Sequence, residues 1–180
     1  TPGRLTASAS AYAAMNTIYC EAFGDHRPAG LITPISRIPN LDGIVEPQPR
    51  CVVGDGVRID RSGEIEDGFS TWTAIRRSGV SEVLVSGIGG GDAAQILNTI
   101  DARVKAAGGS GLKEDGVFNN AYIVAADSRS ASRERLTDFN TAFSGYYAGT
   151  APAGRTAQFV SGFMVETYTC GISNRSIFAG

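Results

Sequence analysis

A segment of fifteen residues occurs twice in this chain, and the repetition limits what the chain can fold into. "NTIYCEAFGDHRPAG" begins at Asn16 and "NTAFSGYYAGTAPAG" begins at Asn140, with identical Asn-Thr and Pro-Ala-Gly ends. Each copy places Asn-Thr in an aromatic stretch with helical spacing, followed by a turn and then by extended segments. Such self-similarity indicates related structural units. We therefore expect a complete unit over residues 55–180, preceded by the C-terminal half of a degenerate unit over residues 1–54.

Composition excludes several classes of protein. Apolar residues make up 42% of the chain and charged residues 19%, which is typical of a packed globular core. The formal net charge is −2, with acidic and basic residues mixed along the chain, and this argues against a nucleic-acid partner. No apolar run approaches the length that spans a bilayer, so no membrane association is expected.

The few cysteine and histidine residues limit the chemistry. Cys20, Cys51 and Cys170 show no metal-binding spacing, and the single histidine, His26, lies in the polar turn "GDHRP". One histidine excludes a histidine-rich metal site and a Ser-His-Asp triad in each copy. The simplest interpretation is a reduced, cytoplasmic protein with small buried thiols.

The first part of the chain predicts one helix and several strands. Tyr12, Met15, Tyr19 and Phe23 form one stripe of a helix over residues 6–23. The remaining segments predict two proline-containing edge or irregular strands, a hairpin and an apolar strand pair, in that order: 30–39, 43–53, 56–68, and 71–77 with 81–87.

The second part alternates helices and strands. Asp92 is the expected N-cap of a helix over residues 92–107, which Gly108 and Gly109 terminate. A strand, a helix and a final pair of strands are then expected over the following segments: 116–127, 131–148, and 155–162 with 163–172.

In their order and spacing, these segments resemble the Rid family, also called YjgF/YER057c/UK114 or L-PSP. The resemblance covers the whole second unit, from "STWTAIRRSGVSEVLVSG" through "QILNTIDARVKAAGGSGLKEDGVFNNAYIVAAD" to "LTDFNTAFSGYYAGTAPAGRTAQFV" and "MVETYTCGI". It implies an α+β fold of chorismate-mutase-like type, a mixed β-sheet with two helices packed on one face. In this chain the fold would occur as one and a half tandem units.

The resemblance also implies an activity. Active members of the family hydrolyse reactive enamines and imines of small carboxylic acids, such as 2-aminoacrylate, to keto acids and ammonia. They need no metal or organic cofactor. They are usually trimers, with sites in the clefts between neighbouring subunits. A homo-oligomer, trimeric or pseudo-symmetric, is therefore expected, with a small carboxylate metabolite as its ligand.

Arg155 is the first candidate site residue. A guanidinium presents parallel donors to a carboxylate and so fixes a small 2-imino acid in one orientation. Arg155 starts a strand after the second Pro-Ala-Gly, with one glycine more than the family pattern has, whereas Leu31 follows the first Pro-Ala-Gly. We call the chain turns at the two Pro-Ala-Gly segments, residues 28–30 and 152–154, the first and second corner. Only the second corner is thus predicted to bind a carboxylate.

Further candidates line the same expected pocket. Ser86 and Gly87 end an apolar strand where the family lines its pocket, and Asn120 lies beside the same sheet. Glu166 and Tyr168 alternate along the expected last strand and are the predicted catalytic residues, because imine hydrolysis needs a water held and deprotonated near the imine carbon.

Departures from the family pattern keep other functions open. The pocket tyrosine of the family falls at about Ser70, its second strand glutamate falls at Tyr168, and its cysteine falls at Ala157. A chorismatase-like hydrolase acting on a small cyclic carboxylate is one alternative, and a non-catalytic module for metabolite binding or assembly is another. A third alternative is an enzyme in which cleavage of the chain exposes Thr1 as an N-terminal nucleophile, although Pro2 gives this idea no support.

Overall fold

The computed structural model describes most of the chain: residues 2–30, 51–66, 69–86, 88–89, 92–160, 162–163 and 167–180. Side chains are described from Ser10 onward within these ranges, except at residues 88–89. No helix among the described residues is long and apolar enough to cross a membrane.

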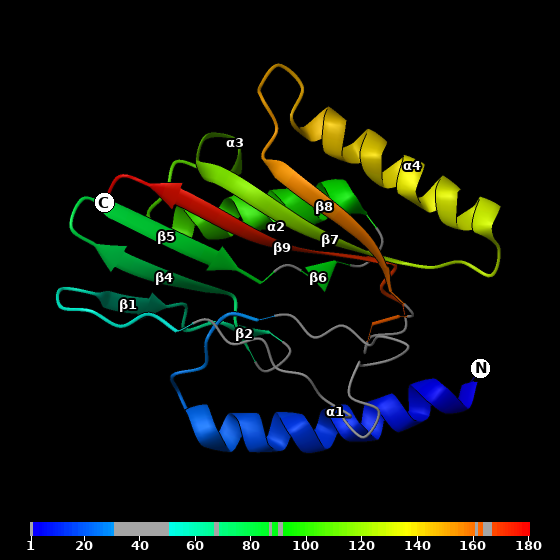
Figure 1. The fold of residues 1–180 in the computed structure, drawn as a ribbon, viewed down its shortest axis with the longest axis horizontal. Coiled ribbons are helices and arrows are strands. Elements are labelled where there is room, and N and C mark those ends of the chain that lie inside the picture. Colours follow the sequence, from blue (N-terminus) through cyan, green and yellow to red (C-terminus); the bar gives the residue numbers. More distant parts are fainter. Residues whose placement is uncertain are drawn as a thin grey trace.

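Helices and strands alternate after a long N-terminal helix (Figure 1). In chain order the elements are α1 (Pro2–Phe23), β1 (Arg58–Arg61), β2 (Ile65–Glu66), β3 (Phe69–Ser70), β4 (Trp72–Arg77), β5 (Val80–Val85), β6 (Ile88–Gly89), α2 (Ala93–Ala106), α3 (Leu112–Asp115), β7 (Gly116–Val124), α4 (Arg129–Tyr146), β8 (Gly154–Val160) and β9 (Cys170–Phe178).

One mixed sheet organises the molecule. Its strand order is β1-β4-β5-β9-β7-β8, with β6 also paired to β9, while β2 and β3 form a separate two-stranded ribbon. The β7–β8 pair is parallel and the other pairs are antiparallel. Strand β8 is thus an edge strand, and the crossover through α4 places it beside β7.

The core lies between one face of the sheet and helices α2 and α4. The buried apolar residues of α2 follow the helical spacing expected from the sequence: Ala93, Ile96, Leu97, Ile100 and Val104. They pack with residues of α4 and of the central strands, including Phe139, Phe143, Val83, Ala121 and Ile172. The predicted N-cap is confirmed, since the Asp92 carboxylate accepts a hydrogen bond of 2.8 Å from the Ala94 amide.

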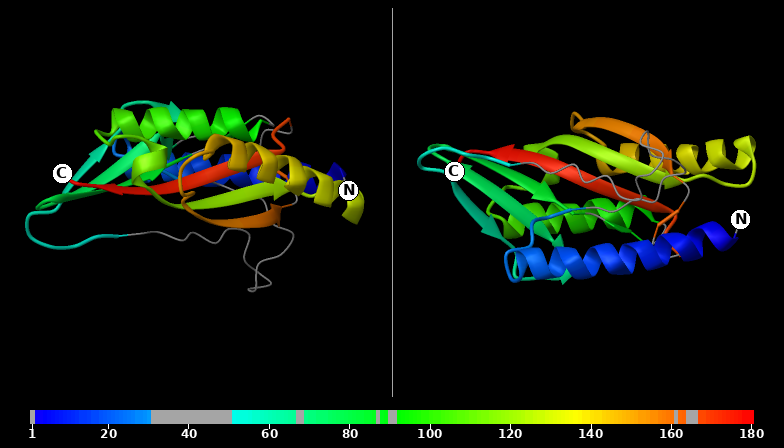
Figure 2. Two further views of the ribbon diagram at one scale, coloured as in Figure 1. Left: turned by 90° about the horizontal axis from the view of Figure 1, so that it is seen from above. Right: turned by 60° about the horizontal axis from the view of Figure 1, so that its bottom comes forward.

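Helix α1 lies apart from this core. It runs beyond the β1 side of the sheet, on the side opposite to β8 and α4 (Figures 1 and 2). The helix ends at Phe23, and Gly24 follows with a φ of +49°, a conformation that glycine adopts without steric cost. The expected helix over residues 6–23 is therefore confirmed, and it begins earlier than expected.

Several predicted strand pairings are wrong. β1 and β2 do not form a hairpin with each other, because β1 pairs with β4 and β2 pairs with β3. The last two strands are not neighbours either, because β7 lies between β8 and β9. The predicted strand over 30–39 lies outside the described residues apart from Gly30, and of the strand predicted over 43–53 only residues 51–53 are described, without strand structure.

Candidate functional site

Two backbone amides of the first Pro-Ala-Gly corner are bound by hydroxyl groups of the sheet. The Ala29 amide donates to Thr73 Oγ1 at 2.7 Å, and the Gly30 amide donates to Ser86 Oγ at 2.8 Å. Both acceptors are buried side chains, Thr73 in β4 and Ser86 directly after β5. The first corner is therefore bound where β4 begins and β5 ends.

A third hydroxyl and two aromatic rings complete this contact. Ser70 Oγ donates to the carbonyl oxygen of Arg27. Tyr19 of α1 packs against Phe69, with 4.8 Å between ring centroids. The family tyrosine was expected at about Ser70. In this structure Ser70 is buried and contacts the first corner, and the aromatic residue beside it that packs against α1 is Phe69.

At the second corner, the guanidinium of Arg155 is exposed yet held in one orientation. Its carbon atom lies 4.7 Å from the ring centroid of Phe143 and 5.3 Å from that of Phe139. Nη1 donates to Asn140 Oδ1 at 2.6 Å. Among the described residues, Arg155 forms no ion pair with a carboxylate, and its contacts there are two ring faces and one amide oxygen.

The extra glycine decides which face of the sheet carries Arg155. Gly154 is the first residue of β8, and Arg155 is paired with Asn119, whose side chain is fully buried on the face that the helices cover. Asn120 and Thr156 occupy the other face, where Thr156 Oγ1 donates to Asn120 Oδ1 at 2.8 Å. Since alternate residues of a strand face opposite sides, Arg155 and Asn120 cannot bind one small ligand within a single unit.

Ser86 is also distant from Arg155 within the unit. Val85 pairs with Asn174, Asn174 with Asn119, and Asn119 with Arg155, so these residues form one row across four strands. Three strand spacings separate the ends of the row by about 14 Å. A small 2-imino acid is too short to reach from Arg155 to the neighbourhood of Ser86.

The polar groups of Ser86 already have partners. Its hydroxyl donates to the Ser70 carbonyl at 3.2 Å and accepts from the Gly30 amide, while its carbonyl accepts from Arg103. Gly87, the neighbouring candidate, lies outside the described residues. In this structure, Ser86 therefore binds the first corner.

The expected alternation of Glu166, Tyr168 and Cys170 along the last strand is wrong, because β9 begins only at Cys170. Tyr168 is half-buried and precedes the strand, and Glu166 lies outside the described residues. Cys170 lies in the same row of the sheet as Phe159, four residues beyond Arg155 along β8, which is a distance of about 13 Å. Tyr168 is thus not beside Arg155 in the same unit.

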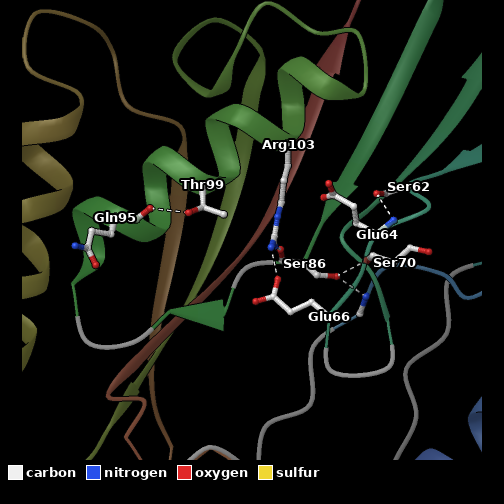
Figure 3. Close-up of polar contacts among 9 residues, drawn as sticks. Ser62, Glu64, Glu66, Ser70, Ser86, Gln95, Thr99 and Arg103 are labelled. Carbon is white, nitrogen blue, oxygen red and sulfur yellow. Dashed lines mark hydrogen bonds and ion pairs between the residues drawn. The ribbon is translucent and has the colours of Figure 1, made fainter.

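The sequence did not reveal two charged residues next to Ser86. Arg103 of α2 donates through Nη1 to the Ser86 carbonyl and through Nη2 to the carboxylate of Glu66 (Figure 3). The two residues are far apart in the sequence and lie on different elements, so no spacing rule joins them. In sequence, Arg103 is a cation in the last turn of a helix, a common position that needs no partner.

Burial raises the pKa of the Tyr19 phenol and of the Cys170 thiol. The pKa of Tyr19, packed between α1 and Phe69, rises to about 12, mainly because the phenolate would lose solvation, while the nearby Arg61 opposes this effect. Burial alone raises the pKa of the Cys170 thiol to about 12. Neither group is poised to exchange a proton near neutral pH.

A surface cavity of about 510 Å³ lies between the start of α4 and strand β8. It is lined by Ala125, Arg129, Ser132, Arg133 and Phe159. Among the residues that the structure describes, no group of His, Cys, Asp and Glu side chains could hold a metal ion.

Comparison with known proteins identifies the fold. No protein-family model matches the chain, and no curated protein matches it. Among solved structures, Rv2704 from Mycobacterium tuberculosis, described as a member of the highly conserved YjgF/YER057c/UK114 family, matches with a TM-score of 0.51 and 16% identity, covering 67% of this chain and 100% of that one. PA3499 from Pseudomonas aeruginosa, a protein of unknown function, matches with a TM-score of 0.50 and 19% identity, covering 67% and 92%.

At these identities the similarity concerns the fold alone. The expected α+β fold, a Rid/YjgF-like mixed sheet with helices, is confirmed over about two thirds of the chain.

Proposed function

We propose that the chain consists of one and a half Rid-like units, residues 1–54 and 55–180. The two repeat copies have matching aromatic geometry: the Tyr19–Phe23 centroids lie 4.6 Å apart at 43°, and the Phe143–Tyr147 centroids lie 4.9 Å apart at 44°. Each pair sits at the end of a helix that leads to a Pro-Ala-Gly corner. Matching pairs at matching positions support a common origin of the two helices.

We propose further that the complete unit hydrolyses reactive enamines and imines of small carboxylic acids, with Arg155 as the anchor of the substrate carboxylate. The observation that carries this proposal is the exposed guanidinium of Arg155, held by Phe143, Phe139 and Asn140. Of its five N–H donors, one is used by Asn140, which leaves donors for a bidentate carboxylate contact. Placing the guanidinium before binding reduces the entropy that the complex must lose.

The chemistry requires a water molecule in addition to the anchor. 2-Aminoacrylate tautomerises to the 2-imino acid, water adds to the imine carbon, and the carbinolamine loses ammonia to give pyruvate. The groups proposed to hold this water are Glu166 and Tyr168. Because Tyr168 lies far from Arg155 in the same unit, the proposed site forms between units, with the anchor from one and the water-holding group from another. No cofactor takes part in these steps.

The first corner provides a precedent for a site between units. Its backbone is bound at the end of β5 by Ser86, as the corner of one unit would be bound by another. Leu31 follows this corner where Arg155 follows the second one, so the precedent lacks the guanidinium.

Ammonia release from enzymatically generated 2-aminoacrylate tests the proposal. We expect the wild-type protein to accelerate release above the spontaneous rate, and Arg155→Ala to lower kcat/KM about a hundredfold, because a charged anchor is lost. Arg133→Ala, which removes an exposed arginine from the same helix that holds Arg155, is the matched control and should keep full activity. If the wild-type protein gives no acceleration, the hydrolase proposal fails.

A non-catalytic module for binding small carboxylates is the second candidate. It is favoured by the engagement of the Ser86 hydroxyl with Ser70 and Gly30, which leaves this group to support the corner. For such a module, pyruvate would bind to the wild-type protein and not to Arg155→Ala, while ammonia release would stay at the spontaneous rate.

A further inference from the structure

A charged pair lies at the junction of the half-unit and the complete unit. Arg103 extends from α2 toward the end of β5, where it meets Glu66 of the β2–β3 ribbon and the backbone of Ser86 (Figure 3). Ser86 in turn binds Gly30 of the first corner. A cation, an anion and the junction backbone thus meet in one place.

The pair is open to solvent mainly on its acidic side. The side chain of Arg103 is 14% exposed and that of Glu66 is 36% exposed. A partly buried guanidinium that keeps an exposed carboxylate partner presents two opposite charges, at a fixed spacing, to a ligand approaching from the Glu66 side. Each charge of a dipolar ligand can lie beside the opposite charge of the pair, whereas a simple anion is also repelled by Glu66 and a simple cation is also repelled by Arg103.

We infer that the Arg103–Glu66 pair is a binding site for a small zwitterion, either an α-amino acid or the 2-iminium acid related to it. The ligand carboxylate would share the guanidinium of Arg103, and its ammonium or iminium group would contact the carboxylate of Glu66. Each protein charge then keeps an opposite charge beside it, so binding leaves no buried charge unpaired. This inference goes beyond the proposed function, because it uses neither Arg155 nor hydrolysis.

The neighbouring surface of α2 suggests a small or polar ligand side chain. Gln95 and Thr99 are exposed and precede Arg103 by successive helical turns, so all three lie along one side of the helix (Figure 3). This side offers an amide and a hydroxyl group along the helix that carries Arg103, and the Thr99 hydroxyl donates to the Gln95 carbonyl at 3.0 Å. We therefore expect small or polar amino acids such as alanine and serine to be preferred over large aliphatic ones.

Calorimetric titration of the full chain with L-alanine, propionate and ethylamine tests the inference. The three ligands are a zwitterion and its two singly charged analogues. We expect L-alanine to bind about tenfold more tightly than either analogue, because only it satisfies both charges. Equal affinities for L-alanine and propionate, or no heat of binding for L-alanine at millimolar concentrations, would overturn the inference.

Variants assign the binding to the pair. Arg103→Met should abolish L-alanine binding, and Glu66→Gln should reverse the preference so that propionate binds better than L-alanine. Arg103→Lys keeps the charge and guards against a folding defect, and it should retain L-alanine binding with reduced affinity. The matched control is Lys105→Met, which removes the cation of a separate α2 ion pair with Asp101 and should bind L-alanine like the wild-type protein.

The outcome is independent of the hydrolase proposal. Arg155→Ala should leave L-alanine binding unchanged while abolishing the acceleration of ammonia release. Loss of L-alanine binding in Arg155→Ala, or an equal loss in Lys105→Met and Arg103→Met, would show that the pair is not the site.

Discussion

Arg155 is oriented by neighbours that a carboxylate ligand need not displace. Cation–π contacts of an exposed cation are worth about 0.5–1 kcal/mol, and they leave the edge of the guanidinium available. The hydrogen bond to Asn140 fixes the rotation of the group about its long axis. The ordering of this long side chain is thus largely achieved before a ligand binds.

At the residue scale, removing this support should weaken ligand binding without removing the charge. We expect Asn140→Ala to reduce the affinity for pyruvate by about threefold to tenfold, since the guanidinium must then be ordered by the ligand. Thr141→Ala is the neighbouring control, because its hydroxyl bonds only within the helix, to the Thr137 carbonyl at 3.0 Å. Calorimetry checks both variants, and equal affinities in wild type and Asn140→Ala would show that the contact does not orient the arginine.

The cysteines should differ in reactivity. Cys51 is exposed, whereas Cys170 is buried and its thiol pKa is raised by burial from about 9 to about 12. We expect a thiol reagent at pH 8 to modify Cys51 within minutes and Cys170 only after denaturation, because the thiolate is the reactive form. Mass spectrometry of the labelled protein checks the order, and early labelling of Cys170 would contradict it.

The same shift predicts how stability depends on pH. A group whose folded pKa lies above its unfolded pKa stabilises the fold below the unfolded value, and this contribution is lost as the pH rises through the folded value. For Cys170 the window therefore runs from about pH 9 to about pH 12. Chemical denaturation should show a smaller loss of stability across this window in Cys170→Ala than in the wild-type protein, measured relative to each protein at pH 8.

Single residues of the site were predictable to very different degrees. The sequence indicates Arg155 as a candidate because a repeated turn precedes it and because the other copy lacks the arginine. The face of the sheet on which Arg155 lies was not predictable, because one added glycine reverses the alternation of side chains along a strand. Arg103 and Glu66 were not predictable either, because their contact depends on how α2 packs against a distant ribbon.

At the scale of elements, the first corner depends on close contact with the sheet. A Cβ atom on Gly30 would lie 2.5 Å from the ring of Phe69, too close for any side chain. We expect Gly30→Ala to destabilise the docking of the corner by about 1–3 kcal/mol, the usual result of overpacking. Hydrogen exchange of the Ala29 amide, which donates to Thr73, should be faster in the variant.

Gly63→Ala is the matched control, because a Cβ atom there meets nothing within 4 Å. It should leave the exchange of the Ala29 amide unchanged. Similar protection of this amide in Gly30→Ala and in the wild-type protein would mean that the corner is not held against Phe69.

The elements also show where sequence patterns succeed and fail. Helix α2 was predictable because its cap and its apolar spacing agree. Strand β9 was not predictable with its observed bounds, because its buried face includes Asn174 and Ser176, which interrupt the apolar alternation. These polar groups are satisfied by each other and by Asn119, with hydrogen bonds of 2.7 Å and 3.0 Å, and no local pattern predicts such a network.

At the scale of the whole molecule, the two corners lie at opposite sides of the sheet. The first corner is bound where β4 begins and β5 ends, and the second corner begins the edge strand β8 (Figure 1). A contact that joins one side of a unit to the opposite side of the next is head-to-tail, and such contacts form a ring when the rotation between units closes. We therefore propose that the half-unit occupies the position that a preceding complete unit would occupy in such an assembly.

This geometry predicts assembly in solution. We expect light scattering coupled to size exclusion to give a mass of more than one chain, because the corner that carries Arg155 needs a partner unit. Arg155→Glu, which places a negative charge at that corner, should shift the mass toward a single chain. A wild-type mass of one chain at all concentrations would contradict the proposed inter-unit site.

A crystal structure of the protein with pyruvate would show whether Arg155 binds the substrate carboxylate at a site between units. We expect the pyruvate carboxylate to lie on the guanidinium of Arg155 and a residue of another unit to contact the same molecule. An Arg155 that faces only solvent, with pyruvate absent or bound elsewhere, would contradict it.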